Sequence, residues 1–397
     1  MFEIVDEKRD GAVIKVIGVG GCGGNAVEHM IHKGVAGVEF IAANTDAQVL
    51  DKNPAPKRIP LGAELTQGLG AGAKPEVGRD AAMESKLAVQ EAIRGADMLF
   101  ITAGMGGGTG TGAAPIIAQL AKEMGILVVA VVTKPFRFEM QKRERAAQAG
   151  IDELQRHVDS LIVVPNEKLI QVLGRNISLP AAFAASNDVL HGAVAGISEI
   201  INKRGLVNRD FADVRTIMSE LGMAMMGTAT ASGENRGKVA AMAAIKSPLL
   251  EDVDLQGARG VLLNITSSSN VELGELYDVT DTVAEFVSAD ATVLWGHVID
   301  DEMGDEMRVT MVATGLGAKK KMTSVQGGLG AALRNEYVIP VIRDGTTGGV
   351  ISAVASIETV AATATTAVDY DLPPGTRGRP GGGRSLEIPT FLRKQAD

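Results

Sequence analysis

The sequence predicts an α/β protein: a parallel, Rossmann-like sheet covered by helices, then a long central helix, then a smaller α+β domain. In the first half, short apolar runs alternate with amphipathic stretches, which is the pattern of strands joined by crossover helices. A segment with helical periodicity follows, and beyond it strands become more frequent than helices. The length of 397 residues suits two domains with additional chain.

Each element is predicted from its apolar period. In the first half we expect strands at 13–19, 38–43, 98–103, 126–132 and 160–164, and helices at 24–33, 81–94, 112–124 and 141–155. The central helix is expected at 181–203, ending before Gly205, a residue type common just after helices. The second part is expected to hold strands at 223–230, 260–266, 292–299 and 307–314, and helices at 236–245 and 273–287.

These elements divide the chain into a sheet domain (1–180), a central helix (181–205) and a smaller domain (206–317). A flexible linker rich in Gly, Ala, Thr and Val is expected at 318–384, although 337–342 and 350–354 are more apolar than a solvated linker should be. A different tail, 385–397, closes the chain.

Composition excludes several functional classes. The 39 basic and 48 acidic residues leave a net charge of −9, which argues against a nucleic-acid binder. The chain starts with charged residues and has no apolar run long enough for a membrane span, so we expect no direct membrane insertion. The one cysteine, Cys22, suits a reducing compartment, and we expect a cytoplasmic protein.

Glycine is unusually abundant and concentrated. Of 48 glycines, sixteen fall in three windows, 18–24, 62–78 and 104–112. Glycine lets a backbone adopt positive φ and approach a ligand closely. Three such loops in one half indicate a ligand larger than a single phosphate.

The first loop, taken alone, favours a dinucleotide enzyme. Gly18, Gly20 and Gly23 satisfy G-x-G-x-x-G between a strand and a helix, and Asp46 lies where a ribose-binding acid would follow. A Rossmann NAD-dependent oxidoreductase is therefore one alternative. It would need a catalytic acid or base, and none of the five histidines lies in an evident catalytic setting.

The other two loops favour a triphosphate. The loop 104–112, with six glycines and two threonines between a strand and a helix, forms an anion-binding concavity of backbone N–H groups. The loop 68–76 offers a third backbone surface. The Walker pattern G-x-x-x-x-G-K-[ST] is absent, so an ordinary P-loop enzyme is not expected.

The motif GGGTGTG at 106–112, with the first loop and TKPFRFE at 133–139, resembles the tubulin/FtsZ GTPase family. The resemblance covers 11–317 and the last dozen residues, and it implies GTP or GDP as ligand, with Mg²⁺ held through the phosphates and water. It assigns nucleotide contacts to the following residues: Gly20, Gly21, Cys22, Gly23, Gly24, Asn25, Gly70, Ala71, Gly72, Ala73, Gly104, Gly106, Gly107, Gly108, Thr109, Gly110, Thr111, Thr133, Pro135, Glu139, Arg143, Asn166, Phe183, Asn187 and Asp188.

Among these, Asn166 resembles a guanine-contacting residue, and Phe183 is available to stack on the base. The family's pattern points to Asp188 for the remaining base contact, because a carboxylate can accept from both N1–H and N2–H of guanine. Asn187 remains a possible additional contact. Met140 stands where the family often has glycine, with no evident chemical consequence.

The resemblance assigns catalysis to Asn208, Asp210 and Asp213, directly after the central helix, where they would position water and Mg²⁺. The alternative is that Asp210 or Asp213 caps the following helix. A helix over 181–203 would be about 34 Å long at 1.5 Å per residue. Acids beyond its end would lie far from a nucleotide bound near its start, so we expect them to serve the nucleotide of the next subunit in a head-to-tail homopolymer.

The tail 385–397 interleaves apolar and basic residues, which favours a docking peptide over the alternative of an ordinary frayed terminus. The resemblance implies membrane tethers such as FtsA and ZipA, regulators such as MinC, and a place beneath the inner membrane at the mid-cell division site. A tubulin-like plasmid-segregation GTPase remains an alternative within the family, and the tail argues against it.

Overall fold

The computed structural model describes residues 11–316, apart from 175, 204–209, 221 and 251–253. The linker and tail predictions for 318–397 therefore lie outside the described residues. No helix of the described part is long and apolar enough to cross a membrane.

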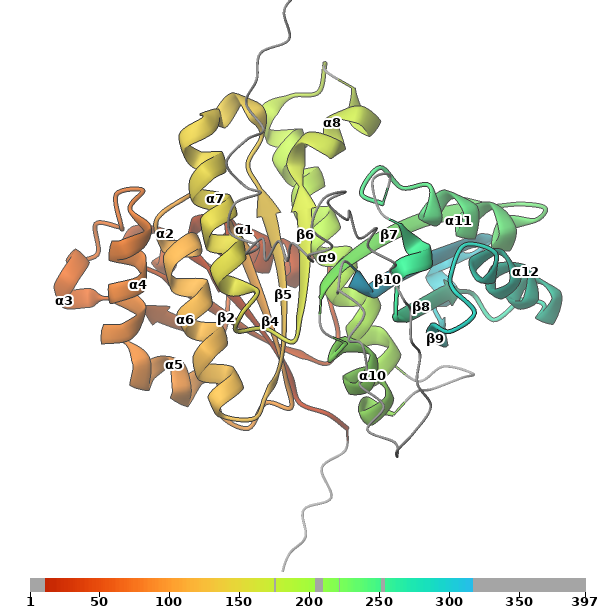
Figure 1. Cartoon of the computed structure of the whole chain (residues 1–397), viewed down its shortest axis with the longest axis horizontal. Coiled ribbons are helices and arrows are strands. Elements are labelled where there is room, and N and C mark those ends of the chain that lie inside the picture. The colour runs from red at the N-terminus through yellow and green to blue at the C-terminus, as the bar shows by residue number, and fades with distance from the viewer. Residues whose placement is uncertain (1–10, 175, 204–209, 221, 251–253, 317–397) are drawn as a thin grey trace, which may run out of the picture. The chain divides into compact units, whose positions relative to one another are not determined.

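One ten-stranded sheet runs through the described chain in the order β3-β2-β1-β4-β5-β6-β7-β10-β8-β9 (Figure 1). The strands are β1 Ile14–Val19, β2 Val38–Asn44, β3 Lys57–Pro60, β4 Met98–Gly104, β5 Leu127–Lys134, β6 Ser160–Pro165, β7 Met223–Ser232, β8 Gly260–Ser267, β9 Thr292–Ile299 and β10 Glu306–Leu316. The strands from β3 to β6 are parallel, as the sequence predicts, and β10 is antiparallel to β7 and β8. The two parts join at β6 and β7 through two residue pairs, Leu161↔Met223 and Ile162↔Ala224.

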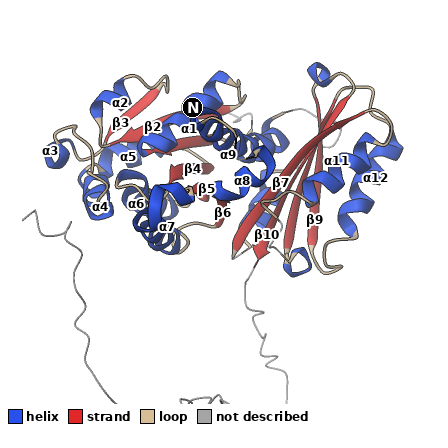
Figure 2. Cartoon of the chain, turned by 90° about the horizontal axis from the view of Figure 1, so that it is seen from above, coloured by secondary structure: helices blue, strands red, loops and turns tan. Residues whose placement is uncertain are grey.

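The helices lie on both faces of this sheet (Figure 2). They are α1 Gly20–His32, α2 Ala47–Asp51, α3 Ala63–Thr66, α4 Pro75–Glu84, α5 Lys86–Ile93, α6 Thr109–Glu123, α7 Met140–Leu154, α8 Asn166–Leu173, α9 Leu179–Asn202, α10 Phe211–Met218, α11 Arg236–Ile245 and α12 Leu273–Ala284. The short 3₁₀ helices are η1 Arg137–Glu139, η2 Leu255–Gly257 and η3 Asp301–Met303.

Three apolar clusters hold the layers together. One packs α4 to α7 on the β1–β6 part of the sheet, and another packs α11 and α12 on β8 and β10. The third packs α1, α9 and α10 on the opposite face and includes side chains from both parts of the sheet, such as Val129 in β5 and Val312 in β10. The long helix α9 thus spans the junction between the two parts.

Several boundaries differ from the sequence expectation. The helix expected at 81–94 is two helices, α4 and α5, separated at Ser85. Its hydroxyl accepts from the Gly62 N–H at 2.9 Å, which ties this point to the loop before α3. The sequence does not predict four short elements, because they show little apolar periodicity. They are β3, α2, α3 and α8.

The first helix begins at Gly20 rather than Gly24. The glycine loop expected ahead of this helix is therefore largely its first turn. The central helix is predicted well, since α9 begins two residues early and ends one residue early. Its start has a physical cause: the Ser178 hydroxyl accepts from the Ala181 N–H, and Pro180 occupies the first turn.

Candidate nucleotide-binding site

The three glycine loops meet beyond the carboxyl ends of β1 and β4. A Cβ added at Gly20 would lie 3.0 Å from the Gly110 nitrogen, and one at Gly104 would lie 2.6 Å from the Cys22 Cβ. A Cβ at Gly108 would lie 2.8 Å from the Ala71 Cβ, which belongs to the third loop. Side chains at these glycines would push the loops apart, so glycine is what allows the three segments to form one cradle.

The first segment offers the amino end of a helix. Gly20, Gly21, Gly23 and Gly24 form the first turns of α1, which contains no acidic residue in its first turn. The first N–H groups of a helix have no intrahelical partner and carry a partial positive charge. Asn25 follows on the exposed side of this turn. The arrangement suits a phosphate group.

The second segment leads from β4 into α6. Gly106 adopts φ +100°, and its N–H donates to the buried Thr111 hydroxyl at 2.8 Å. Thr111 therefore shapes the loop, while Thr109 lies at the start of α6 with its hydroxyl 2.6 Å from that of Thr45. Gly107 is half-buried and Gly108 is buried. This segment provides a second helix amino end beside the first.

The third segment, Gly70 to Ala73, connects α3 and α4. Ala71 is buried against Gly108, whereas Gly72 and Ala73 are exposed. Gly70, Gly72 and Ala73 all have positive φ, and Ala73 has the value +59°. For alanine this left-handed conformation costs energy, because its Cβ approaches the following carbonyl oxygen.

The segment after β5 lies beside the second loop. Thr133 is buried and Pro135 is half-buried, and Glu139 accepts from the Phe136 N–H at 2.9 Å. Glu139 also pairs with Arg143 at 3.1 Å, and a Cβ on Gly106 would lie 2.7 Å from the Arg143 carbonyl oxygen. Glu139 and Arg143, both predicted nucleotide contacts, are thus brought next to the loop 104–108.

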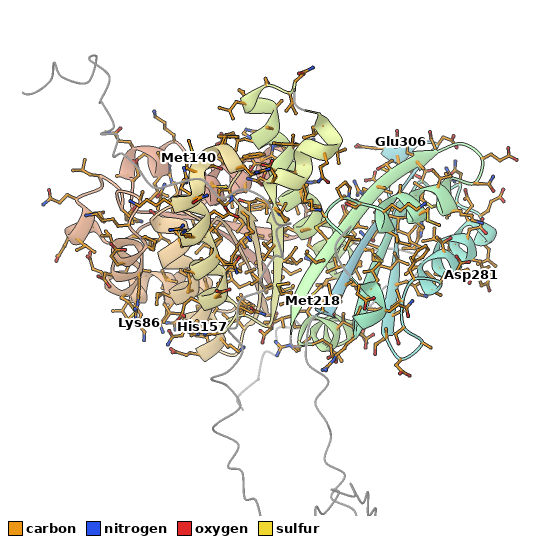
Figure 3. The ribbon with its side chains drawn as sticks, turned by 45° about the horizontal axis from the view of Figure 1, so that its top comes forward. Lys86, Met140, His157, Met218, Asp281 and Glu306 are labelled. Carbon is orange, nitrogen blue, oxygen red and sulfur yellow. The ribbon has the colours of Figure 1, made fainter. Side chains whose placement is uncertain are left out.

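Met140 in this segment adopts an unusual backbone conformation, which its position in the sequence does not predict. It adopts φ 74° and ψ 158°, a region that is nearly restricted to glycine. Its side chain is largely exposed at the surface (Figure 3). The glycine that the resemblance leads one to expect here would adopt this conformation without strain.

Aromatic and amide groups lie at the amino end of α9. Phe183 is 39% exposed, and its ring meets that of Phe136 edge-on at 5.4 Å between centroids. Asn166 is buried, and its Oδ1 accepts from the Ser186 hydroxyl at 2.8 Å. Phe183 offers a partly exposed face, and Asn166 leaves its NH₂ group for another acceptor.

Asn187 and Asp188 are placed differently. Asn187 follows Phe183 by four residues, so the two share one face of α9. The Asp188 carboxylate instead lies 2.7 Å from Nε2 of His29 and 3.7 Å from Nζ of Lys33, near the end of α1. In this structure, Asp188 joins α9 to α1, and Asn187 is the one on the Phe183 face.

Two residues near the first loop have clear local roles. Asp46, the candidate ribose-binding acid of an oxidoreductase, caps α2 by accepting from the Val49 N–H at 3.2 Å. Cys22 lies 3.9 Å from the Thr133 hydroxyl. Burial raises the pKa of the Cys22 thiol, and the contact with Thr133 opposes that shift only in part.

The predicted catalytic acids lie beyond the other end of α9. Asp210 occupies the position before α10 but makes no capping hydrogen bond through its side chain, and Asp213 is exposed in the first turn. Asn208 lies outside the described residues. The part of α9 from Asn187 to Asn202 rises about 24 Å, at 1.5 Å per residue. The structure therefore does not bring Asp210 and Asp213 together with the cradle of their own chain.

Sequence reasoning missed contributors to the cradle. Thr45 supports Thr109, and the buried Phe136 backs Phe183. Thr45 carries no motif, and only its place after β2, beside the ends of β1 and β4, would have identified it. Within the described residues, no group of three or more His, Cys, Asp or Glu side chains could hold a metal ion.

Comparisons with known proteins identify the family. Residues 13–174 match the GTPase domain of the Tubulin/FtsZ family, and residues 222–317 match the C-terminal domain of the FtsZ family. The chain is 53% identical over 410 positions to the cell division protein FtsZ of Pseudomonas aeruginosa, covering all of both chains. It is 58% identical over 334 positions to that of Coxiella burnetii, covering 84% of this chain and 85% of the relative.

A solved structure agrees. The FtsZ dimer of M. jannaschii superimposes with a TM-score of 0.75 at 42% identity, covering 79% of this chain and 90% of that one. The matches to the family models and to full-length relatives rule out the oxidoreductase alternative. With its glycine cradle, its sheet and these relatives, the chain belongs to the FtsZ family of tubulin-like GTPases, the cytoskeletal proteins of cell division.

Proposed function

We propose that this GTPase holds the phosphates of GTP or GDP in the cradle formed by 20–25, 70–73 and 104–111. The support is the convergence of two helix amino ends, those of α1 and α6, on one point. Their unpaired N–H groups meet the phosphate charge without a Walker lysine. Mg²⁺ would be held through phosphate oxygens and water, where it would neutralise charge on the leaving group.

For the base, the placement of side chains supports Asn187 over Asp188. Asn166 and Phe183 offer an amide and a ring at the start of α9, and Asn187 lies on the same helical face as Phe183. Asp188 is already paired with His29 and Lys33. A carboxylate held by these two side chains would have to leave both of them to reach guanine.

Hydrolysis is proposed to occur between two copies of the chain stacked head to tail. The observation that carries this proposal is the separation of the cradle from Asp210 and Asp213 by the length of α9. Exposed apolar residues around the cradle, Leu69 at 79%, Phe138 at 54% and Met140 at 72%, suit contact with another subunit. A head-to-tail contact that does not close builds a filament.

The test is the variant Asp213→Ala. It should bind GTP as the natural protein does and lose at least a hundredfold in turnover, because the acid acts on the neighbour's γ-phosphate. Asp80→Ala, an exposed acid on α4, is the matched control and should hydrolyse GTP normally. The natural protein's turnover per molecule should also rise with protein concentration. Normal turnover in Asp213→Ala, or a rate independent of concentration, would falsify catalysis in trans.

We also propose that the chain divides into a nucleotide-binding domain (1–180), the central helix (181–205), a smaller activation domain (206–317), a linker (318–384) and a docking tail (385–397). Family membership supports a tail that binds division proteins of the FtsA, ZipA and MinC kinds, and a site of action beneath the inner membrane at mid-cell. The apolar-basic composition of 385–397 is the property of this chain that supports the first of these.

A further inference from the structure

The amide of Asn166 is held by a buried serine in the central helix. The Ser186 hydroxyl donates to Asn166 Oδ1 at 2.8 Å, and both residues are buried. Asn166 begins α8, directly after β6, whereas Ser186 lies in α9, three residues after Phe183 and one before Asn187. Residues three and four apart are neighbours on a helix surface, so Phe183, Ser186 and Asn187 share one face. Ser186 thus ties Asn166 to the face of α9 that carries the other two side chains proposed to meet the base.

The direction of this hydrogen bond fixes the orientation of the amide. A serine hydroxyl can donate to Oδ1 of an amide or accept from its Nδ2. Serines inside helices can also donate to a carbonyl of the preceding turn, as Ser198 does to Ala195 at 3.2 Å. Ser186 makes no such bond to any described residue, and its proton goes to Asn166 Oδ1. With the amide turned around, that proton would be buried without an acceptor, which costs free energy.

The fixed orientation leaves a group that can only donate. With Oδ1 engaged by Ser186, Asn166 offers its NH₂ group, which has two protons and no acceptor. Among the described residues, Nδ2 of Asn166 is not one of the buried polar atoms that lack a partner. No hydrogen bond from Nδ2 to another described residue accounts for this, so the nitrogen still reaches the surface.

A donor at this place distinguishes between purine bases. Guanine carries the acceptor O6 where adenine carries the N6 amino group, which is a donor. An NH₂ group held toward that edge forms a hydrogen bond with guanine and leaves two donors facing each other with adenine. A site whose polar groups would be left unpaired rejects the wrong ligand strongly. Hypoxanthine, the base of IDP, keeps O6 and lacks only the 2-amino group of guanine.

We propose that Ser186 is a positioning residue for base selection: it holds the Asn166 amide with its NH₂ group toward the base, which favours guanine and excludes adenine. The inference rests on the proposed binding of the base beside Asn166 and Phe183. To that proposal it adds the residue that decides which atom of the amide the base meets.

Competition binding to the full chain measures the base preference. GDP, IDP and ADP displace a fluorescent GDP whose dye is on the ribose, and diphosphates avoid hydrolysis during the measurement. In Ser186→Ala, the ratio of the ADP to the GDP dissociation constant should fall at least tenfold, because the released amide can turn and offer Oδ1 to adenine. The IDP-to-GDP ratio should stay within twofold of the natural value, since IDP keeps O6.

Two results of this measurement overturn the proposal. One is an unchanged ADP-to-GDP ratio in Ser186→Ala. The other is an equal fall in the ADP-to-GDP and IDP-to-GDP ratios, which would show a general loosening of the site. Binding of the fluorescent GDP by the variant shows that its phosphate cradle is folded.

Ser198→Ala is the matched control. Ser198 is also buried in α9, but its hydroxyl donates to the backbone of the same helix. It lies twelve residues beyond Ser186, about 18 Å along the helix axis. Its removal should leave both ratios unchanged. A fall in the ADP-to-GDP ratio as large as that of Ser186→Ala would overturn the specific role of Ser186.

Asn166→Ala separates this inference from the proposed base site. Adding Ser186→Ala to this variant should not lower the ADP-to-GDP ratio further, because no amide is left to orient. If Asn166→Ala lowers the ratio and Ser186→Ala alone does not, the base site stands and the positioning role is overturned. If Asn166→Ala leaves the ratio unchanged, the base contact and the positioning role are both overturned.

Discussion

At the residue scale, the site depends on glycines, because its loops approach one another more closely than side chains would allow. A side chain at Gly104 would collide with Cys22, and one at Gly106 with the Arg143 backbone. Close contacts of this kind explain why glycine occupies these positions of the loops. Met140 shows the opposite case, a large residue held in a conformation that glycine adopts easily.

Cys22 gives a prediction at this scale. Its pKa is raised by burial, so the thiol stays protonated further into the alkaline range than a free cysteine does. Alkylation by iodoacetamide should therefore increase about tenfold per pH unit from pH 7 and not level off by pH 9. Bound GTP should slow it, because Cys22 lies in the first turn of α1.

Mass spectrometry of this only cysteine measures the rate, and the protein unfolded in guanidinium is the control. In the control, the pH profile should level off earlier, near the ordinary thiol pKa. A rate in the folded protein that levels off below pH 8, or one unaffected by GTP, would contradict the placement of Cys22 in the cradle.

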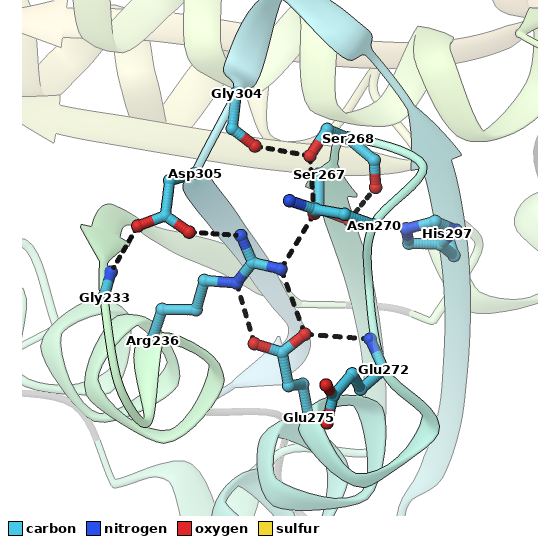
Figure 4. A network of polar contacts seen from close by, with 10 residues as sticks. All are labelled: Gly233, Arg236, Ser267, Ser268, Asn270, Glu272, Glu275, His297, Gly304 and Asp305. Atoms are coloured by element: carbon cyan, nitrogen blue, oxygen red, sulfur yellow. Dashed lines mark hydrogen bonds and ion pairs between the residues drawn. The ribbon is translucent and has the colours of Figure 1, made fainter.

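At the element scale, a buried ion network fastens the turns of the second part. Arg236, 4% exposed at the start of α11, donates to both oxygens of Glu275 in α12 at 2.7 and 3.1 Å (Figure 4). It also donates to Asn270 at 3.0 Å and to Asp305 at 3.3 Å. One guanidinium thus joins α11, the β8–α12 loop, α12 and the turn before β10.

The network predicts a pH-dependent contribution to stability. The hydrogen bonds from Arg236 hold the pKa of Glu275 below its usual value, helped by the Glu272 N–H. A carboxyl with a lowered folded pKa stabilises the fold above its unfolded pKa, and that stabilisation disappears as pH falls through the folded value. Glu275→Gln should therefore lower the free energy of unfolding by about 1–3 kcal/mol at pH 7.

Denaturant unfolding at pH 7 and below pH 4 measures this difference. The difference in unfolding free energy between the natural protein and Glu275→Gln should become smaller in acid, because the natural carboxyl group also becomes neutral there. Glu234→Gln, an exposed acid close to the network in sequence, is the control and should have little effect at either pH. If Glu275→Gln lowered the unfolding free energy equally at both pH values, the carboxylate charge would not be the cause of the stabilisation.

At the scale of the whole molecule, α9 sets the distance between nucleotide binding and the proposed catalytic acids. It contacts β5 and β6 on one side of the junction and β8, β9 and β10 on the other. A helix of 24 residues, about 36 Å long, cannot bring its two ends to one phosphate. In the proposed head-to-tail assembly, the acids of one copy would act on the GTP of the next.

Deleting residues 386–397 tests the tail as a separate function of the molecule. The variant should keep GTP turnover and polymerisation, because the deletion leaves the cradle and α9 intact, and should lose binding to membrane-anchored division proteins. Co-sedimentation with vesicles that carry such an anchor measures the loss, with light scattering of the polymer as the control. Retained co-sedimentation would show that the anchor binds elsewhere on the chain.

The sequence alone determined the fold class, the long helix and the three glycine loops. Those features follow from local period and backbone freedom, which are properties of short segments. It could not determine the break at Ser85 or the capping role of Asp46, because each depends on a partner that lies elsewhere in the fold or on local side-chain geometry.

Only the tertiary structure showed which faces meet. Asn187 and Asp188 are adjacent in the chain, yet a turn of about 100° per residue places one on the Phe183 face and the other against α1. The place of β9 at the end of the described sheet likewise results from strand order, which strand sequences do not encode one by one. Local chemistry thus specified the parts of the nucleotide cradle, and long-range packing decided which side chains surround it.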